Sequence, residues 1–465
     1  MKSTASAADI AQAVKSGETS ARAVTAATLG RIEANNGRLG AFTDVTAARA
    51  MAQADRVDAD VRAGKAGPLA GVPFGAKNLF DLGDLVTRAG SKINRDNPPA
   101  KTDARLVAKL EAAGAICVGA LNMGEYAYDF TGENAHDGPS RNPHNLAHMS
   151  GGSSGGSGTA VAAGMVPLAL CSDTNGSIRV PSSFCGLFGL KPTYGRLSRH
   201  GTFPFVASLD HLGPVARSVT DLALSYDAMQ GFDEADPAMT KRPMELLAGR
   251  LEHGGSGYRV AVADGYFTGE PEAREAVAHV AKALDVTRQV TIPDAATARA
   301  AAFLITMAEG GSLHLDRLRS RADDFDPDTR DRLLAGAMLP AAWIDKAQKF
   351  RRAYREKFLQ LFQDVDAILA PATPMRAPLI GQKVATVAGI EMPLRPNIGI
   401  YTQPISFIGL PVVAVPVWIG EYDLPIGVQI IAPPWREDIA MRLARQLEKV
   451  GAARAPVAAG FAEIE

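Results

Sequence analysis

A glycine- and serine-rich run, GGSSGGSG at residues 151–158, leads directly into a helix-like segment at 159–164 and then into the apolar residues 165–170. A flexible linker is one interpretation of such a run. It fits poorly, because linkers do not usually join two ordered apolar segments so closely. Glycine-rich loops at the start of a helix instead present backbone N–H groups to a negatively charged group. The run therefore predicts a functional loop inside an ordered domain.

Apolar runs that are typical of buried strands occur both before and after this loop. At 103–120 a helix-like stretch leads into an apolar strand, and the same alternation recurs downstream. The alternation predicts an α/β fold: one large domain over 1–465 with a mixed, twisted β-sheet and helices on both faces. The predicted strands lie within 67–81 and at 115–120, 258–262, 367–370, 412–415 and 426–431.

Two regions of this domain differ in composition from the rest. Residues 1–64 predict an N-terminal helical segment, because Ala, Glu and Arg are dense and Ser6 to Asp9 form a capping box. Residues 233–298 are more charged and predict a peripheral insertion with a helix at 272–284. A further helix, rich in Lys and Arg, is expected at 341–362.

Charge, cysteine and histidine content narrow the functional classes. Lys plus Arg total 49 and Asp plus Glu total 50, without single-sign blocks, so nucleic acid is not an expected partner. The three cysteines form no CxxC pair and predict reduced core residues. No signal peptide and no run of about 18 apolar residues is present, which predicts a soluble, cytoplasmic protein without a membrane partner. The eight histidines form no HExxH motif, so we expect no metal and no cofactor.

One hydrolase class is disfavoured by the order of its residues. The segment 152–156 matches the GxSxG nucleophile elbow of Ser-His-Asp hydrolases. In that fold the histidine follows the serine and usually comes late, whereas the last histidine here is His314. A different base must therefore activate the serine.

Lys77 is the candidate for that base. It stands among apolar residues, and the nearest acid in sequence is Asp81. A lysine accepts a proton at neutral pH only if burial depresses its pKa by about three units, at a cost near 4 kcal/mol. A lysine with an exposed ammonium group, or one in a structural ion pair, is the other interpretation of the local sequence.

Three segments taken together indicate a protein family, which none of them does alone. They are GVPFGAK at 71–77, GGSSGGSG at 151–158 and SDTNGSIRVPSSFCGLFGLKPTYGRLS at 172–198. In this order and spacing they resemble the amidase signature family, whose signature core would lie at 67–200. The resemblance implies the amidase signature fold and an amidohydrolase that works through an acyl-enzyme.

The resemblance also implies a role for each of several residues. Ser177 would attack the carbonyl carbon, Ser153, held by a cis peptide bond, would relay the proton, and Lys77 would accept it. The backbone N–H groups of Thr174, Asn175, Gly176 and Ser177 would form the oxyanion hole. A single donor of that kind contributes about 3–4 kcal/mol in the transition state.

One position departs from the family pattern. Members usually have Gly-Gly-Ser where this chain has Asn175-Gly176-Ser177. Asparagine would be the least costly replacement if the first position needed a positive φ.

The neighbours of these residues have structural interpretations. Asp173 and Arg179 are expected to form an ion pair that braces the nucleophile loop. Ser154 is either a hydrogen-bonding neighbour of the triad or a loop former, and Cys171 and Cys185 are expected to pack in the core.

Segments outside the signature narrow the substrate. Residues 90–95, 121–128 and 308–315 resemble the branch of the family that includes 1-carboxybiuret hydrolase, and Asn175 is similar to that branch. This implies a small urea-type amide, ammonia release, and a small helical accessory subunit or a homo-oligomer. Such a substrate is anionic, so Arg141 and Arg395 are candidates for a cation that binds it. A structural role is nevertheless the first expectation for both.

Three alternatives remain open at this stage. The chain also resembles, through the same signature, the glutamine-hydrolysing component of tRNA-dependent amidotransferases, and a general aliphatic or aryl amidase would share it as well. A catalytically silent scaffold is the alternative from another class, but it would be expected to lack the lysine or a serine of the triad, and all three are present.

Overall fold

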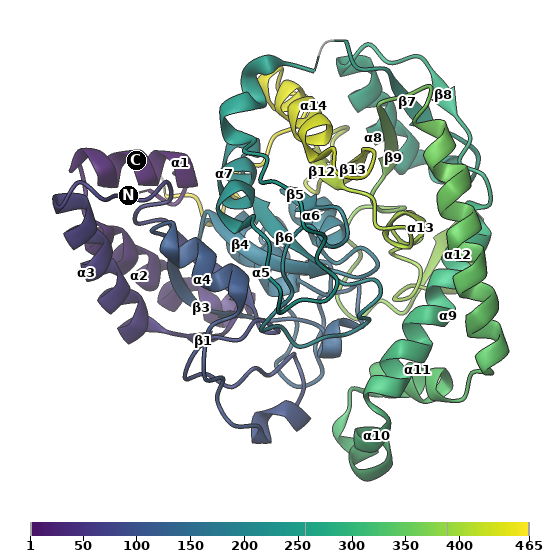
Figure 1. The fold of residues 1–465 in the computed structure, drawn as a ribbon, viewed down its shortest axis with the longest axis horizontal. Coiled ribbons are helices and arrows are strands. Elements are labelled where there is room, and N and C mark those ends of the chain that lie inside the picture. The colour runs from purple at the N-terminus through teal and green to yellow at the C-terminus, as the bar shows by residue number, and fades with distance from the viewer. Residues whose placement is uncertain (1, 256, 388, 464–465) are drawn as a thin grey trace.

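The computed structural model describes residues 2–255, 257–387 and 389–463. A long β-sheet runs through the molecule, with helices packed on both of its faces (Figure 1). The figure shows α1, α2 and α3 at one end of the molecule and α9, α11 and α12 at the other. The single α/β domain with a mixed sheet that the sequence predicts is confirmed.

The main sheet has 11 strands in the order β1-β3-β2-β4-β6-β5-β12-β13-β9-β7-β8. Parallel pairs lie at β3-β2-β4 and at β9-β7-β8, and the other pairs are antiparallel. The strands are β1 (Phe42–Val45), β2 (Pro73–Lys77), β3 (Ile116–Leu121), β4 (Leu168–Asp173), β5 (Phe188–Lys191), β6 (His211–Ala216), β7 (Val260–Ala263), β8 (Gln289–Val290), β9 (Ala367–Pro371), β12 (Val412–Val417) and β13 (Ile426–Ile431).

Strands from both ends of the sequence meet in the centre of this sheet. Every residue of β2, β4, β12 and β13 is buried, which explains why these strands are nearly continuous apolar runs rather than alternating ones. The prediction that early and late strands share one sheet is confirmed, because β5 pairs with β12. A separate two-stranded ribbon consists of β10 (Val384–Val387) and β11 (Ile390–Pro393).

Helices cover the sheet and its ends. Among them α7 packs on β6, α8 on β13 and β9, and α14 on β12. They are α1 (Ala7–Ser16), α2 (Ala21–Leu39), α3 (Ala47–Arg62), α4 (Arg105–Ala112), α5 (Gly155–Ala162), α6 (Arg179–Cys185), α7 (Val219–Met229), α8 (Pro271–Ala283), α9 (Ala295–Leu313), α10 (Leu315–Arg321), α11 (Pro327–Ala337), α12 (Ala341–Leu361), α13 (Gln403–Ser406) and α14 (Glu437–Lys449). Short 3₁₀ turns lie at Ile93–Asp96, Glu125–Ala127, Ala248–His253, Gly265–Thr268 and Ala322–Asp324.

The N-terminal region is not wholly helical. The capping box is present, because Ser6 Oγ accepts a hydrogen bond from Asp9 N at 3.0 Å. The prediction of an N-terminal helical segment over 1–64 is wrong at β1, where Phe42 and Val45 pair antiparallel with β3 and so extend the sheet. A short strand with an aromatic and a β-branched residue gains more from such pairing than from continuing a helix.

The glycine-rich run is also partly helical. Helix α5 begins at Gly155, inside the run, and all of its residues are buried. A Cβ atom on Gly156 would lie 2.3 Å from Ala41 O and 2.5 Å from Asn122 N. Glycine at this position is therefore required for close packing against the segments next to β1 and β3, and the linker interpretation is excluded.

The region 233–298 lies at one end of the sheet. It supplies β7 and β8, and β7 pairs in parallel with β9. That the region is an insertion remains a prediction.

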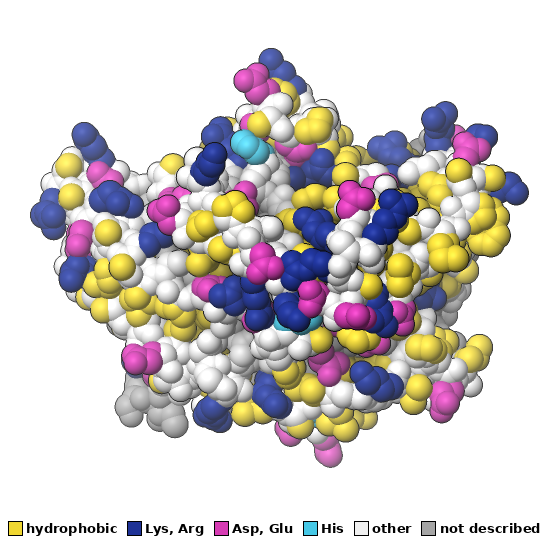
Figure 2. Space-filling model, turned by 90° about the horizontal axis from the view of Figure 1, so that it is seen from below, with side chains coloured by type: hydrophobic (Ala, Val, Ile, Leu, Met, Phe, Trp, Pro, Cys, Tyr) yellow, Lys and Arg dark blue, Asp and Glu magenta, His cyan; other side chains and the backbone are white. Residues whose placement is uncertain are grey.

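Charges of both signs share the surface. On the face shown in Figure 2, Lys and Arg side chains are interspersed with Asp and Glu and with hydrophobic side chains. Within the described ranges, no helix is both long and apolar enough to cross a membrane.

Candidate active site

The site lies where the parallel strands β2 and β4 end. Lys77 is the last residue of β2, and Ser172 is the residue before the last of β4. Because neighbouring parallel strands point the same way, their carboxyl ends bring these two side chains to the same edge of the sheet. The Nζ atom of Lys77 donates a hydrogen bond to Ser172 Oγ at 2.9 Å.

Lys77 contacts a second serine hydroxyl. Its Nζ atom lies 2.6 Å from Ser153 Oγ, and neither side chain is exposed to solvent. Burial lowers the pKa of Lys77 to about 7, against the raising effect of the more distant Cys171 and Asp173. An amine with this pKa exchanges protons near neutral pH, as a general base must.

Ser153 lies in the loop that leads into α5. The peptide bond between Gly152 and Ser153 is cis, as the family resemblance implies. The carbonyl oxygen of Ser153 accepts a hydrogen bond from Gly124 N at 3.1 Å, and Ser154 Oγ donates one to Ser172 O at 3.3 Å. Ser154 therefore ties the loop to β4.

Ser177 lies in the loop that joins β4 to α6. It is 3% exposed and lines a narrow cavity of about 20 Å³. In the described part of the chain, its hydroxyl makes no hydrogen bond to Ser153 or Lys77. The structure thus brings Lys77 and Ser153 into contact and leaves the hydroxyl of Ser177 free at the cavity.

The same loop carries unpaired backbone donors. Within the described residues, no hydrogen bond from the N–H groups of Thr174, Asn175, Gly176 or Ser177 is present. Buried N–H groups without an acceptor are rare in folded proteins, because each costs the free energy of a lost hydrogen bond. Several of them in succession, beside a free hydroxyl, leave backbone donors available to an acceptor that is not part of the chain.

The loop is held from behind by a buried ion pair. Arg179 Nη2 lies 2.9 Å from Asp173 Oδ1, with neither side chain exposed, which confirms the predicted pair. The same carboxylate accepts a hydrogen bond from Ile178 N at 3.1 Å. The positive charge of Arg179 lowers the pKa of Asp173 well below its usual range, although burial opposes this. Asp173 therefore stays ionised and fixes the start of α6.

Asn175 replaces a glycine of the family pattern, but not because this position needs a positive φ. Asn175 is not among the residues with positive φ, whereas Gly176 has φ 148°. A Cβ on Gly176 would lie 2.3 Å from Thr402 Oγ1, so this position is the one that requires glycine. The Asn175 side chain lines the cavity, and its Nδ2 donates to Thr306 Oγ1 at 2.9 Å.

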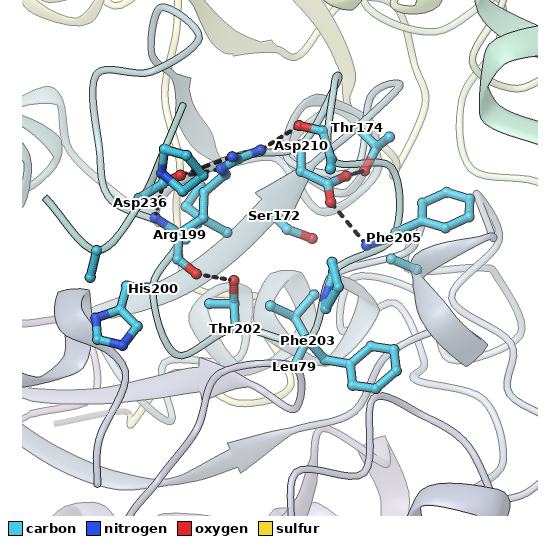
Figure 3. Close-up of a pocket in the computed structure, with 16 residues that line it drawn as sticks. Leu79, Ser172, Thr174, Arg199, His200, Thr202, Phe203, Phe205, Asp210 and Asp236 are labelled. Carbon is cyan, nitrogen blue, oxygen red and sulfur yellow. Dashed lines mark hydrogen bonds and ion pairs between the residues drawn. The ribbon is translucent and has the colours of Figure 1, made fainter. Parts of the chain in front are cut away.

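A larger cavity of about 170 Å³ adjoins the narrow one and shares Ala127, Thr174 and Phe205 with it. Figure 3 shows this cavity with Ser172 and Thr174 in its wall. The Asp210 carboxylate accepts a hydrogen bond from Thr174 Oγ1 at 2.6 Å (Figure 3). The nucleophile candidate lines only the narrow cavity, so that is the one where the chemistry is expected.

The other residues noted in the sequence have structural roles. Arg141 donates to Leu146 O at 2.8 Å, and Arg395 lies 2.9 Å from Asp129 and 2.7 Å from Asp328. Cys117, Cys171 and Cys185 are free and fully buried.

Among the polar residues of the site, Ser172 and Arg332 were not found from the sequence. Ser172 binds the lysine, and its place before Asp173 at a strand end was the available signal. Arg332, from α11, lines the narrow cavity, and no motif surrounds it. Among the described residues, no group of three or more His, Cys, Asp or Glu is arranged to hold a metal ion.

The family model for amidases matches residues 23–440. The chain belongs to the amidase signature family. It is therefore an amide hydrolase with an amidase signature fold.

Its relatives in that family span nearly its whole length. It is 53% identical over 450 residues to the 1-carboxybiuret hydrolase subunit AtzE of Pseudomonas sp. (strain ADP). The alignment covers 96% of this chain and 98% of the relative. A component of the glutamyl-tRNA(Gln) amidotransferase of Geobacter sp. (strain M21) is 34% identical, covering 95% of this chain and 96% of that one. A solved structure of an s-triazine catabolic enzyme, described as a vestigial protein complex, superposes with a TM-score of 0.96 at 52% identity, over 97% of this chain and 100% of the other.

Proposed function

We propose that this amidase signature enzyme cleaves a small urea-type amide with Ser177 as nucleophile, Ser153 as proton relay and Lys77 as base. Ser177 Oγ attacks the carbonyl carbon, its proton moves to Ser153, and the proton of Ser153 moves to the neutral amine of Lys77. The C–N bond then breaks, and the leaving nitrogen takes the proton back along the same path and departs as ammonia. Water hydrolyses the acyl-enzyme by the same route.

The contact between Lys77 and Ser153 carries this proposal. A fully buried amine 2.6 Å from a hydroxyl, with a pKa of about 7, is a base matched to neutral pH. The other interpretation, an exposed or ion-paired lysine, does not fit, because the exposed fraction of Lys77 is 0% and it forms no ion pair among the described residues.

The unpaired N–H groups of the loop complete the proposed mechanism. The backbone donors of Thr174, Asn175, Gly176 and Ser177 would stabilise the oxyanion that forms when Ser177 attacks. Such donors are already oriented before the reaction, so each contributes about 3–4 kcal/mol in the transition state.

The proposed substrate is 1-carboxybiuret or a closely similar biuret. The identity of 53% to a component of 1-carboxybiuret hydrolase supports it, and the narrow cavity beside Ser177 favours a small molecule. A positive charge suited to an anionic substrate is also present. The Arg332 guanidinium lines this cavity, 3.8 Å over the Tyr128 ring, and donates to the carbonyl oxygens of Tyr128 and Asp328. Within the described ranges Arg332 has no acidic partner, whereas Arg395 is neutralised by three.

An accessory subunit or a homo-oligomer is a further part of the proposal. It is supported by the description of the similar s-triazine enzyme as part of a protein complex. Light scattering measures the mass of the purified chain in solution, first for the chain expressed alone and then for the chain co-expressed with the genes adjacent to its own. A mass above that of one chain supports a homo-oligomer or an accessory subunit.

The decisive experiment measures ammonia release from 1-carboxybiuret, biuret, glutamine and an aryl amide. We expect turnover with the first two. Efficient hydrolysis of glutamine without the biurets would favour the amidotransferase alternative, and hydrolysis of the aryl amide alone would favour a general amidase.

A further inference from the structure

The cavity beside Ser177 contains two buried polar groups that lack a partner. Asn175 is 6% exposed and Tyr128 is 6% exposed, and both line this cavity. Within the described part of the chain, neither Asn175 Oδ1 nor the Tyr128 hydroxyl has a hydrogen-bond partner. A buried polar group left unpaired destabilises the folded chain, and such groups are rare, so two in one cavity indicate a binding site for a molecule with complementary polar groups.

The orientation of the Asn175 amide is fixed. Its Nδ2 atom donates to Thr306 Oγ1 at 2.9 Å, and Thr306 is itself 1% exposed on α9. With the nitrogen engaged by the helix, the oxygen is the free end of the amide. It is an acceptor only, so it is complementary to an N–H group.

The Tyr128 side chain is also held in place. Its ring packs against Phe205 with 4.9 Å between centroids and lies under the Arg332 guanidinium. Burial raises the pKa of Tyr128 to about 12, so the hydroxyl keeps its proton at neutral pH and can donate it. Its natural complement is a carbonyl oxygen.

The remaining walls do not compete for these groups. Phe130, Phe303 and Pro396 are apolar and offer no hydrogen-bonding group to Asn175 or Tyr128. Gln403, the other amide in the lining, already accepts a hydrogen bond from Arg299 Nε at 2.9 Å.

We propose that Asn175 and Tyr128 are specificity determinants that bind the second ureido group of the substrate: Asn175 Oδ1 accepts the bridging N–H, and the Tyr128 hydroxyl donates to the distal carbonyl. The inference rests on the proposed function, since it assumes a urea-type substrate at Ser177. It also gives a reason for asparagine where the family pattern has glycine, because a simple amide offers no bridging N–H.

The test compares biuret with malonamide, in which a CH₂ group replaces the bridging N–H. The value of kcat/KM for each is measured in wild type, Asn175→Gly, Thr306→Val and Tyr128→Phe. We expect Asn175→Gly to reduce the biuret-to-malonamide ratio by about tenfold or more, the loss of one hydrogen bond. Thr306→Val should shift the ratio in the same direction by less, because it releases the amide without removing it.

Tyr128→Phe should affect the two diamides alike, since both have a distal carbonyl, and it should affect the monoamide propionamide less. The matched control is Thr25→Val, a buried helical threonine of α2 that is likewise without a partner for its hydroxyl. An equal loss on biuret and malonamide in Asn175→Gly, with the ratio unchanged in Thr306→Val, would overturn the role of Asn175.

Failure of the proposed function gives a different result. In that case the wild type would release ammonia from malonamide or propionamide but not from biuret. The role of Asn175 and Tyr128 in binding a second ureido group would then be wrong as well. If the wild type hydrolyses biuret and only the ratios stay fixed, the proposed function stands and this inference alone is wrong.

Discussion

Lys77 Nζ lies 2.6 Å from Ser153 Oγ although 76 positions separate the two residues in sequence. The lysine ends a buried strand and the serine precedes a buried helix, so the contact exists only in the folded sheet. Both groups are out of water, which makes their interaction stronger than it would be at the surface.

Replacing Lys77 by methionine should abolish activity without loss of fold. Members of one proton relay fail as a unit, so we expect kcat to fall by about a thousandfold or more. Burial lowers the pKa of Lys77 in the folded state, so the buried amine disfavours folding most below about pH 7, and this penalty fades as the pH rises to the usual lysine value. Part of the penalty therefore remains at pH 8. The variant should therefore unfold at the same or a higher temperature at pH 8.

The control for this substitution is Lys109→Met. Lys109 is partly buried and donates to Gln230 O at 2.6 Å, away from the site. Its replacement should leave kcat close to that of wild type. A Lys77→Met enzyme that keeps about a tenth or more of wild-type turnover would show that the base lies elsewhere.

The pH dependence of kcat/KM should report the same amine. The neutral form of Lys77 is the active one and its pKa lies at about 7. Activity should therefore rise with pH through 7, by about tenfold per unit on the acid side, and level off above 8. Titration of initial rates between pH 5 and 9 measures this. A profile that is flat down to pH 5 would contradict a lysine base.

Ser177→Ala should remove turnover of every amide that the wild type cleaves. A fluorophosphonate probe should label Ser177, and peptide mass spectrometry identifies the modified residue. Ser154→Ala is the control: its hydroxyl bonds to Ser172 O, so the variant should still be labelled. Labelling that is lost in Ser154→Ala and kept in Ser177→Ala would revive the nucleophile-elbow interpretation.

Asp173→Asn should destabilise the protein strongly. It leaves Arg179 with a buried, uncompensated charge, and removal of one partner of such a pair costs about 3–5 kcal/mol. Urea denaturation gives the free energy of unfolding. The matched control is Asp55→Asn in the exposed pair Arg22–Asp55, for which about 0–1 kcal/mol is expected. Similar losses in the two variants would mean that the buried pair does not hold the loop.

Gly176→Ala should slow catalysis more than it lowers stability. The new Cβ would lie 2.3 Å from Thr402 Oγ1, so the loop must move, and a shift of an ångström at the reacting groups costs about a hundredfold in rate. Gly30→Ala in α2, where a Cβ would meet nothing within 4 Å, is the control and should stabilise the helix by about 0.5–1 kcal/mol. Equal rates for wild type and Gly176→Ala would argue against the oxyanion role of this loop.

The sequence was informative where the chain is locally regular or follows a family motif. Apolar runs located β2, β3, β7, β9, β12 and β13, whereas no strand was predicted at β5 or β6 in the middle of the sheet. Three motifs located Lys77 and Ser153, which the fold brings into contact. It was less informative where long-range packing decides. The strand at Phe42–Val45 depends on its partner β3, and Arg332 reaches the cavity only because α11 packs on α9. Asn175 Oδ1 and the Tyr128 hydroxyl lack a partner because no hydrogen-bonding group from a distant part of the chain lies beside them, and a local sequence pattern does not predict this.

The cavity is enclosed by two kinds of structure. The reacting groups come from the sheet and the buried loops beside it, whereas Phe303, Thr306 and Arg332 come from helices α9 and α11 at the outer end of the molecule. Substitutions in those helices can therefore alter which molecules are accepted without touching the proton path. For an engineer, or for natural selection acting on new nitrogen sources, these two helices are where substrate range can be retuned.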